Sequence, residues 1–394
     1  MTSPVSTAAP SQRLESVDLL RGLVMVIMAL DHTRDFWSSS PFDPTDLTQT
    51  STAMFCTRWI THLCAPVFMA LAGTGAALSL GRGRDRGSLA RFLITRGLWL
   101  VVLELTVVNF GWKGFANIDL VHYRAMVIWA LGWSMVALAG LIYLPRWLLI
   151  SVGAIMVLGH NALDGVSAES MGHASWLWTI LHEFGVLGDW EHGPALLVLY
   201  PLVPWIGVMA LGYAFGAWIS QEPLRSDPRL RQRYYVAIAA AMLVSFVVLR
   251  GLDWYGDPAP WSVQPSRVFT VLSFLNVTKY PPSLLYLLVM LGIALLLLAG
   301  FEQWRAAATR VLLVFGRVPL FFYILHIMLI GRVAELTYRL QIGHLPYRGS
   351  PEEFGFGLVG VYAVWIVAIA ALYPVCRWYA GVKARHPGGW LSYL

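Results

Sequence analysis

Long apolar runs recur along this chain, and short polar links separate them. A hydrocarbon core of about 30 Å requires about 20 apolar residues per helix. The pattern therefore predicts about ten membrane-spanning helices, at residues 17–36, 54–80, 89–111, 125–144, 147–163, 194–219, 234–251, 282–300, 311–331 and 356–376. The predicted fold is an all-α polytopic membrane helix bundle, with a polar N-terminal tail at 1–16, a transmembrane domain at 17–377 and a C-terminal tail at 378–394.

The arginines of the links predict an orientation. The positive links at 81–91, 220–233 and 301–310 fall on the same side as the C-terminal tail if the chain crosses ten times. The opposite loops are rich in acids, for example Asp164 and Asp189. Because cytoplasmic loops of membrane proteins are enriched in Lys and Arg, this arrangement predicts that both termini are cytoplasmic.

Composition agrees with a membrane protein. Of 394 residues, 57% are hydrophobic and 13% are charged, whereas soluble domains average about 25% charged residues. The net charge of +6 is almost entirely arginine, and we interpret it as an orientation signal that does not indicate nucleic-acid binding. Two of the three cysteines, Cys56 and Cys64, fall in or beside one predicted span, which argues against a disulfide framework.

The first predicted helix contains the most informative pattern. Arg21 and His32 are eleven residues apart, close to three helical turns, so they fall on one stripe with ends ~16 Å apart. Ionisable side chains inside a membrane helix are costly and indicate a functional site. The 311–331 span repeats the design, with Arg317 at its inner end and His326 nearer its outer end.

Two layers of polar side chains result when the spans are oriented. The inner layer contains the arginines, and the outer layer contains histidines with neighbouring charges. The inner set is Arg21, Arg91, Arg96 and Arg317, and the outer set includes Asp31, His32, Arg58, His62 and His326. Inner arginines can also serve only as topology signals that reach the interface, and His62 and His326 can equally be core histidines.

The two layers favour a specific chemistry. Guanidinium groups bind phosphate oxygens, so the inner layer suits a phosphate-bearing cytosolic ligand. Imidazole titrates near neutral pH and transfers protons, and we expect Asp31 to orient His32 for this task. A donor bound inside and an acceptor activated outside describe a group transfer across the membrane. We expect no metal site and no tightly bound cofactor.

Several motifs resemble the catalytic domain of the heparan-α-glucosaminide N-acetyltransferase family, within the wider transmembrane acyltransferases. The resemblance runs along most of the chain, and its motifs are Arg13–Gly22 with Asp31-His32, Cys64–Gly73, Phe92–Trp99, Val127–Trp133, Lys279–Leu284 and Gly316–His326.

The resemblance implies acetyl-CoA or another acyl-CoA as co-substrate and a sugar hydroxyl or amine as acceptor. It implies that Arg91 and Arg96 engage the acyl-CoA and that a histidine is catalytic. The lysosomal enzyme of this family has its proposed histidine just before the second span, but Asp46–Thr57 contains none here. His32 or His62 is therefore expected to take that role.

Our functional prediction is an integral membrane acyltransferase of a bacterial inner membrane. Asp31, His32 and His62 are the expected catalytic residues, and Arg21, Arg91, Arg96, Arg317 and His326 are the expected substrate-binding residues. The expected partners are acyl-CoA, a carbohydrate acceptor and the lipid bilayer, without nucleic acid; homo-oligomerisation stays open. The alternative is a proton-coupled secondary transporter of a glycan or anionic metabolite, for which broken helices in two related halves would be expected.

Overall fold

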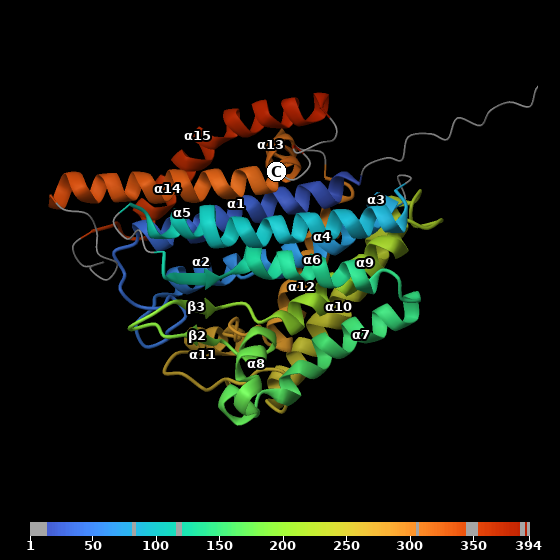
Figure 1. Ribbon diagram of the computed structural model, residues 1–394, viewed down its shortest axis with the longest axis horizontal. Helices are drawn as coiled ribbons and strands as arrows, with labels where there is room; N and C mark the ends of the chain where they lie inside the picture. The colour runs from blue at the N-terminus through green and yellow to red at the C-terminus, as the bar shows by residue number, and fades with distance from the viewer. Residues whose placement is uncertain are drawn as a thin grey trace, which may run out of the picture.

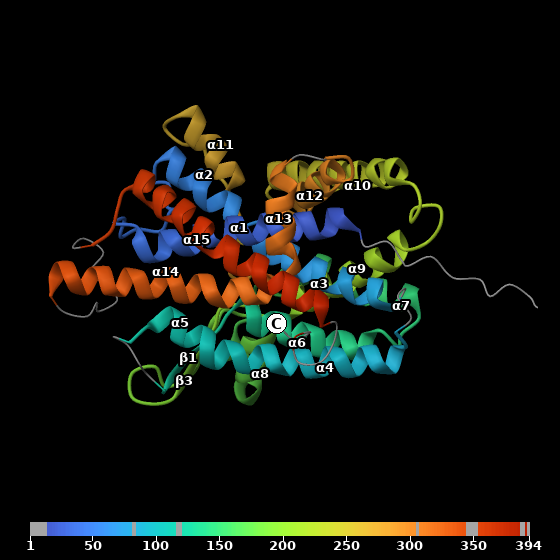
Figure 2. The same ribbon diagram turned by 90° about the horizontal axis from the view of Figure 1, so that it is seen from above.

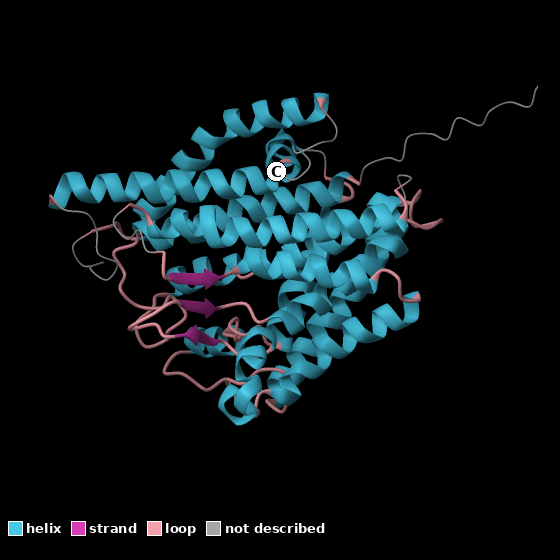
Figure 3. Ribbon diagram, in the orientation of Figure 1, coloured by secondary structure: helices cyan, strands magenta, loops and turns pink. Residues whose placement is uncertain are grey.

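The computed structural model describes residues 14–80, 84–115, 120–304, 307–343, 354–386 and 391 of the chain. The described part is mostly helical, with three short strands gathered at one end (Figures 1 and 3). The predicted N-terminal tail, apart from its last three residues, lies outside the described residues, as do Arg82 and Arg305.

Five long helices lie side by side along the long axis of the molecule (Figure 1). They are α1 (Glu15–Trp37), α3 (Cys64–Leu80), α4 (Arg86–Leu103), α6 (Val127–Leu141) and α14 (Pro319–Ile342). Further long helices pack around this group: α7 (Arg146–Gly159), α9 (Leu202–Ile219), α10 (Pro228–Leu252), α12 (Leu284–Phe301) and α15 (Leu358–Arg385). Helix α15 crosses over α1, α13 and α14 (Figure 2).

Short helices extend or connect the long ones. They are α2 (Thr52–Thr61), the π-helix η1 (Glu104–Val108), α5 (Asn109–Lys113), the 3₁₀ helices η2 (His160–Leu163) and η3 (Ala168–Ala174), α8 (Ser175–Leu181), α11 (Arg267–Leu275) and α13 (Ala307–Arg317). Arg86–Lys113 is thus one continuous helical rod. Glu104 stabilises its contact with α6, because its Oε2 accepts hydrogen bonds from the backbone N–H groups of Ile128 and Trp129, at 2.9 and 3.1 Å.

Eight helical segments of the described chain are long and apolar enough to cross a membrane, which confirms a polytopic helical bundle but gives fewer spans than predicted. The two remaining predicted spans correspond to α1, whose apolar run is interrupted by charges, and to α6, which has only 15 residues. The predicted span 311–331 is also wrong as one helix. It divides into α13 and α14 at Val318, and Pro319 occupies the first turn of α14, where no backbone N–H is needed.

A small sheet modifies the all-α prediction. Strands β1 (His122–Ala125) and β2 (Gly185–Gly188) flank β3 (Ala195–Val198). The first pair is parallel, with Tyr123 opposite Leu196, and the second is antiparallel, with Val186 opposite Leu197. The predicted span 194–219 therefore begins as a strand, and its helix starts only at Leu202.

The two ends of the bundle differ in charge and structure. The end of α3, the start of α4 and the α9–α10 link lie at the right of Figure 1, and the sheet lies at the left. We call the first the arginine end, because its described links contain Arg84, Arg86 and Arg225. Helix α15 continues beyond residue 377, so the first part of the predicted C-terminal tail is helical to Arg385.

Glycines let α3 and α9 approach closely. A Cβ added at Gly73 would lie 2.0 Å from the carbonyl oxygen of Met209, and one at Gly212 would lie 2.3 Å from that of Ala70. Small residues at such crossings allow the backbones of membrane helices to meet. The glycine-rich stretch of α3 is therefore a helix contact, as its position inside a span suggests.

Gly73→Ala should destabilise the protein by about 1 to 3 kcal/mol, because the added methyl group forces α3 away from α9. Thermal unfolding in detergent measures the effect. The matched control is Gly140→Ala in α6, where an added Cβ meets no atom within 4 Å and removal of a helical glycine should be neutral or stabilising. Equal melting temperatures for the two variants would contradict the close contact.

Candidate functional site

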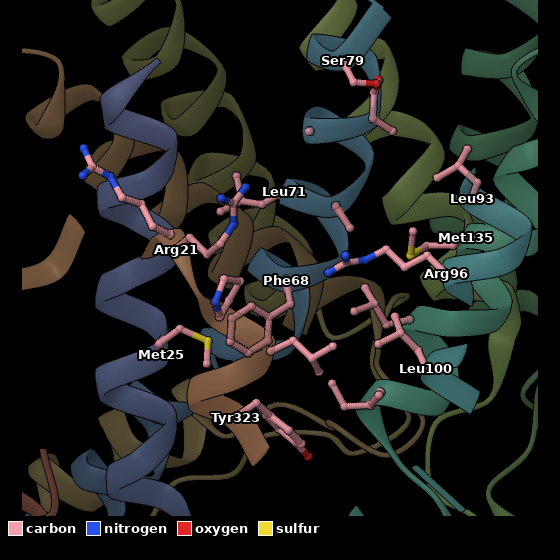
Figure 4. A pocket seen from close by; sticks show the side chains of 18 of the residues that line it. Arg21, Met25, Phe68, Leu71, Ser79, Leu93, Arg96, Leu100, Met135 and Tyr323 are labelled. Carbon is pink, nitrogen blue, oxygen red and sulfur yellow. The ribbon is translucent and has the colours of Figure 1, made fainter. Parts of the chain in front are cut away.

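A cavity of about 660 Å³ lies between α1, α3, α4, α6, α14 and α15. Its lining contains four cations: Arg21, Arg96, Arg317 and Lys383. Apolar side chains form most of the remaining wall. In Figure 4, Ser79 lies at one end of this space, while Phe68 and Tyr323 lie at the other, and Arg96 points into it from α4. We call this space the arginine cavity.

The three arginines that line the cavity differ in their contacts and in their exposure. The Arg21 guanidinium donates to Asp18 Oδ1 at 2.8 Å and to the carbonyl oxygen of Gly316 at 3.3 Å, so it lies against the α13 segment. Arg96 lies 5.8 Å from the ring centroid of Phe92, another lining residue. Arg317 is exposed at the junction of α13 and α14.

Arg91 is not in this cavity, contrary to the predicted Arg91–Arg96 pair. The two residues are five positions apart on α4, which places them about 140° apart around the helix. Arg91 is exposed on another face. The structure thus brings together three of the four predicted arginines and adds Lys383 from α15.

A second cavity of about 180 Å³ contains His32, and we call it the histidine cavity. Its polar lining residues are Asp31, His32, Asp35, Arg58, Thr61, Tyr200, Lys279, Tyr280 and Tyr323. Phe68, Val127 and Tyr323 line both cavities. The two cavities therefore share a wall formed by these three side chains, with cations lining the cavity on one side and His32 lining the cavity on the other.

His32 is oriented by His326. The Nδ1 atom of His32 lies 2.7 Å from Nε2 of His326, whose own Nδ1 lies 3.0 Å from the carbonyl oxygen of Phe322. A carbonyl oxygen only accepts, so we assign the proton of a neutral His326 to Nδ1. Its Nε2 then accepts from Nδ1–H of His32, which leaves the lone pair of His32 on Nε2. This is the tautomer that a general base requires.

Asp31 does not orient His32, contrary to the prediction from the sequence. Its Oδ1 lies 3.0 Å from Arg34 and its Oδ2 lies 2.6 Å from Arg58 on α2. Asp31 and His32 are neighbours on α1, so their side chains point about 100° apart. The carboxylate faces α2, while the imidazole faces α14.

His62 and His326 also differ from their predicted places. His62 ends α2, is 3% exposed and does not line the histidine cavity. Its carbonyl oxygen accepts from the Tyr286 hydroxyl at 2.8 Å. His326 is completely buried behind His32 and lines neither cavity. It therefore contacts the candidate base and has no open face for a substrate.

Several side chains that line the histidine cavity are absent from the predicted site, among them Trp112, Tyr200, Lys279 and Tyr280. The Trp112 ring packs edge-on against His32, with centroids 4.8 Å apart. The hydroxyls of Tyr200 and Tyr280 are 3.4 Å apart. Lys279 and Tyr280 belong to the Lys279–Leu284 motif of the family resemblance. A lysine in an apolar, proline-rich loop is the sequence feature that could have indicated a site residue here.

Asp31→Asn should destabilise the protein by about 3 to 5 kcal/mol, because it leaves the buried Arg58 without its carboxylate. Asp35→Asn is the control: Asp35 also pairs with Arg34, at 2.6 Å, but its side chain is 36% exposed against 11% for Asp31. Loss of that pair should change stability by less than about 1 kcal/mol. Thermal unfolding in detergent compares them, and a larger effect for Asp35→Asn would refute the assignment.

The comparisons with known proteins agree with the predicted resemblance. The family model described as heparan-alpha-glucosaminide N-acetyltransferase, catalytic, matches residues 13–252, which is more than half of the chain. A comparison with curated proteins finds no match. The matched segment includes Arg21, His32, Arg58 and Arg96, and it ends before Lys279 and His326. The chain belongs to the heparan-alpha-glucosaminide N-acetyltransferase catalytic-domain family.

Proposed function

We propose that this protein is a membrane acetyltransferase that acts on glycans. It moves an acetyl group from coenzyme A, bound in the arginine cavity, to a sugar hydroxyl or amine in the histidine cavity. Family membership implies the acetyltransferase class. The observation that supports this donor and this route is that a cationic cavity and the cavity of His32 lie next to each other and share a wall of Phe68, Val127 and Tyr323.

The arginine cavity suits the donor. Coenzyme A carries several phosphate charges, and guanidinium groups bind phosphate oxygens in a fixed geometry. Arg96, Arg317 and Arg21 would hold these phosphates, while the thioester arm would pass Phe68 and Tyr323. The length of α1 between Arg21 and His32, ~16 Å, separates the phosphates from the reacting carbonyl.

In the proposed reaction, His32 is the general base. Its Nε2 takes the proton of the acceptor hydroxyl or amine as the acceptor attacks the thioester carbonyl carbon. His326 holds the His32 ring in the correct tautomer through the 2.7 Å hydrogen bond. Collapse of the tetrahedral intermediate releases the coenzyme A thiolate, which receives the proton from His32.

The arginine end faces the cytoplasm in this proposal, as the positive-inside rule requires. Coenzyme A is a cytosolic, membrane-impermeant anion, so its cavity belongs at that end. The acceptor would reach the histidine cavity from the opposite side, and the membrane would be the inner membrane of a bacterium.

Arg96→Gln should weaken binding of acetyl-CoA by about tenfold or more, because a charge-assisted hydrogen bond to phosphate is worth about 1.5 to 3 kcal/mol. Arg91→Gln, on the exposed face of the same helix, is the matched control and should bind like wild type. Thermal stabilisation of the detergent-solubilised protein by acetyl-CoA reports the affinity. Equal losses in both variants would indicate a general charge effect and exclude the assigned cavity.

His32→Gln should lower kcat for transfer of labelled acetyl from acetyl-CoA to glucosamine by about 10² to 10⁴, the usual contribution of general base catalysis. His326→Leu should lower kcat less, because His32 remains but loses its orienting partner. Acetyl-CoA should still raise the melting temperature of both variants. Full activity of His32→Gln, or uptake of glucosamine by proteoliposomes without acetyl-CoA, would contradict the proposed function.

A further inference from the structure

Lys279 is buried in the histidine cavity, and no carboxylate of the described residues lies within ion-pair distance of it. The residue is 9% exposed, and its Nζ lies 5.1 Å from the centroid of the Tyr280 ring. Of the two cations that line this cavity, Arg58 is neutralised by Asp31 at 2.6 Å. Lys279 forms no ion pair with any described carboxylate. Asp31 pairs directly with Arg34 and Arg58, so positive charge is in excess around Lys279, and an anion formed beside its ammonium would be stabilised.

The backbone around Lys279 is fixed by a buried aspartate. Asp257 accepts hydrogen bonds from the backbone N–H and the hydroxyl of Thr278, at 2.9 and 2.8 Å, and from the Ser283 hydroxyl at 2.7 Å. The Ser283 backbone N–H donates in turn to the carbonyl oxygen of Thr278 at 3.0 Å. These hydrogen bonds hold the loop at Thr278, before Lys279, and at Ser283, after it. The backbone of the loop therefore positions Lys279 in the cavity.

We propose that Lys279 is a catalytic residue that stabilises the oxyanion of acetyl transfer. This role rests on the proposed function. As the acceptor oxygen or nitrogen bonds to the thioester carbon, the C=O π electrons move onto the carbonyl oxygen, and His32 Nε2 takes the acceptor proton. The ammonium of Lys279, which lines the same cavity as His32, would stabilise the new negative charge, and such an interaction is strong in a buried site. The charge returns to the carbonyl when the C–S bond breaks, and His32 protonates the departing thiolate.

The neighbouring groups are less suited to this role. His62 lies outside the cavity, and His326 is hydrogen-bonded to His32. The Arg58 guanidinium already balances Asp31. Lys279 is therefore the one lining cation whose charge is available, and the reaction would supply the anion that the resting site lacks.

The test compares Lys279→Met, which keeps an unbranched side chain of similar length and removes its charge, with Lys279→Arg, which keeps a charge. The assays measure acetyl transfer from acetyl-CoA to glucosamine and to hydroxylamine, which has none of the binding groups of a sugar. Lys279→Met should lose about 10² to 10³ in kcat with both acceptors, with little change in the KM of either. Lys279→Arg should recover part of the rate. Stabilisation by acetyl-CoA should equal that of wild type in both variants.

Lys113→Met is the matched control, because this lysine lies outside both cavities and donates to the carbonyl oxygen of His122; it should transfer acetyl at the wild-type rate. Wild-type kcat in Lys279→Met overturns the proposal. A loss with glucosamine alone also overturns it, since that result describes an acceptor-binding residue. If Lys279→Met fails to fold, a Lys279→Arg variant with wild-type KM and reduced kcat supports the role, and an unchanged kcat with raised KM refutes it. Absence of acetyl-CoA binding to wild type would instead refute the proposed function itself.

Discussion

The ion network of Asp31 with Arg34 and Arg58 determines how α1 sits in the bundle. A carboxylate in an apolar environment must be paired, and here it is paired across to α2 at 2.6 Å. Since neighbouring residues of a helix point about 100° apart, docking Asp31 on α2 turns His32 toward α14. There it meets His326 at 2.7 Å, and the tautomer of the candidate base follows from that contact. One charge pairing thus fixes both the helix rotation and the direction of the free imidazole nitrogen.

The two cavities differ in their polar lining, and this difference suits a donor with a charged head and a thin neutral arm. Three arginines and a lysine line the arginine cavity, whereas Asp31 and Asp35 pair with the two arginines near His32. Between them stand Phe68, Val127 and Tyr323. If a ligand passes between these mostly apolar side chains, an uncharged chain passes at lower cost than a phosphate does, so a bound anion would keep its charged head at the arginine end while its reactive end reaches His32.

The sequence was sufficient to predict features that depend on local periodicity. The helical bundle and the Arg21–His32 stripe follow from spacing along single helices. Rotations between helices do not follow from spacing. Spacing alone therefore groups Arg91 with Arg96 although about 140° separates them around the helix, and it pairs Asp31 with His32 although the partners of Asp31 are Arg34 and Arg58. The sequence pattern assigns Ala195–Val198 to a membrane span, because a short buried strand and the start of an apolar helix have the same composition. Lys279 was missed because its burial depends on Asp257, more than 20 residues away.

The two cavities extend beyond the matched family segment. That segment ends at residue 252, yet Arg317 lines the arginine cavity and Lys279 lines the histidine cavity from beyond it, and His326 contacts His32. The packing explains why the two parts depend on each other. A Cβ at Gly22 would lie 1.9 Å from the carbonyl oxygen of Leu312, and one at Gly316 would lie 2.0 Å from that of Asp18, so α1 and α13 meet backbone to backbone. This crossing sets the position of Arg317 relative to Arg21, and α14, which begins directly after it, sets that of His326 relative to His32. The candidate base is therefore assembled only when both ends of the sequence have docked on each other.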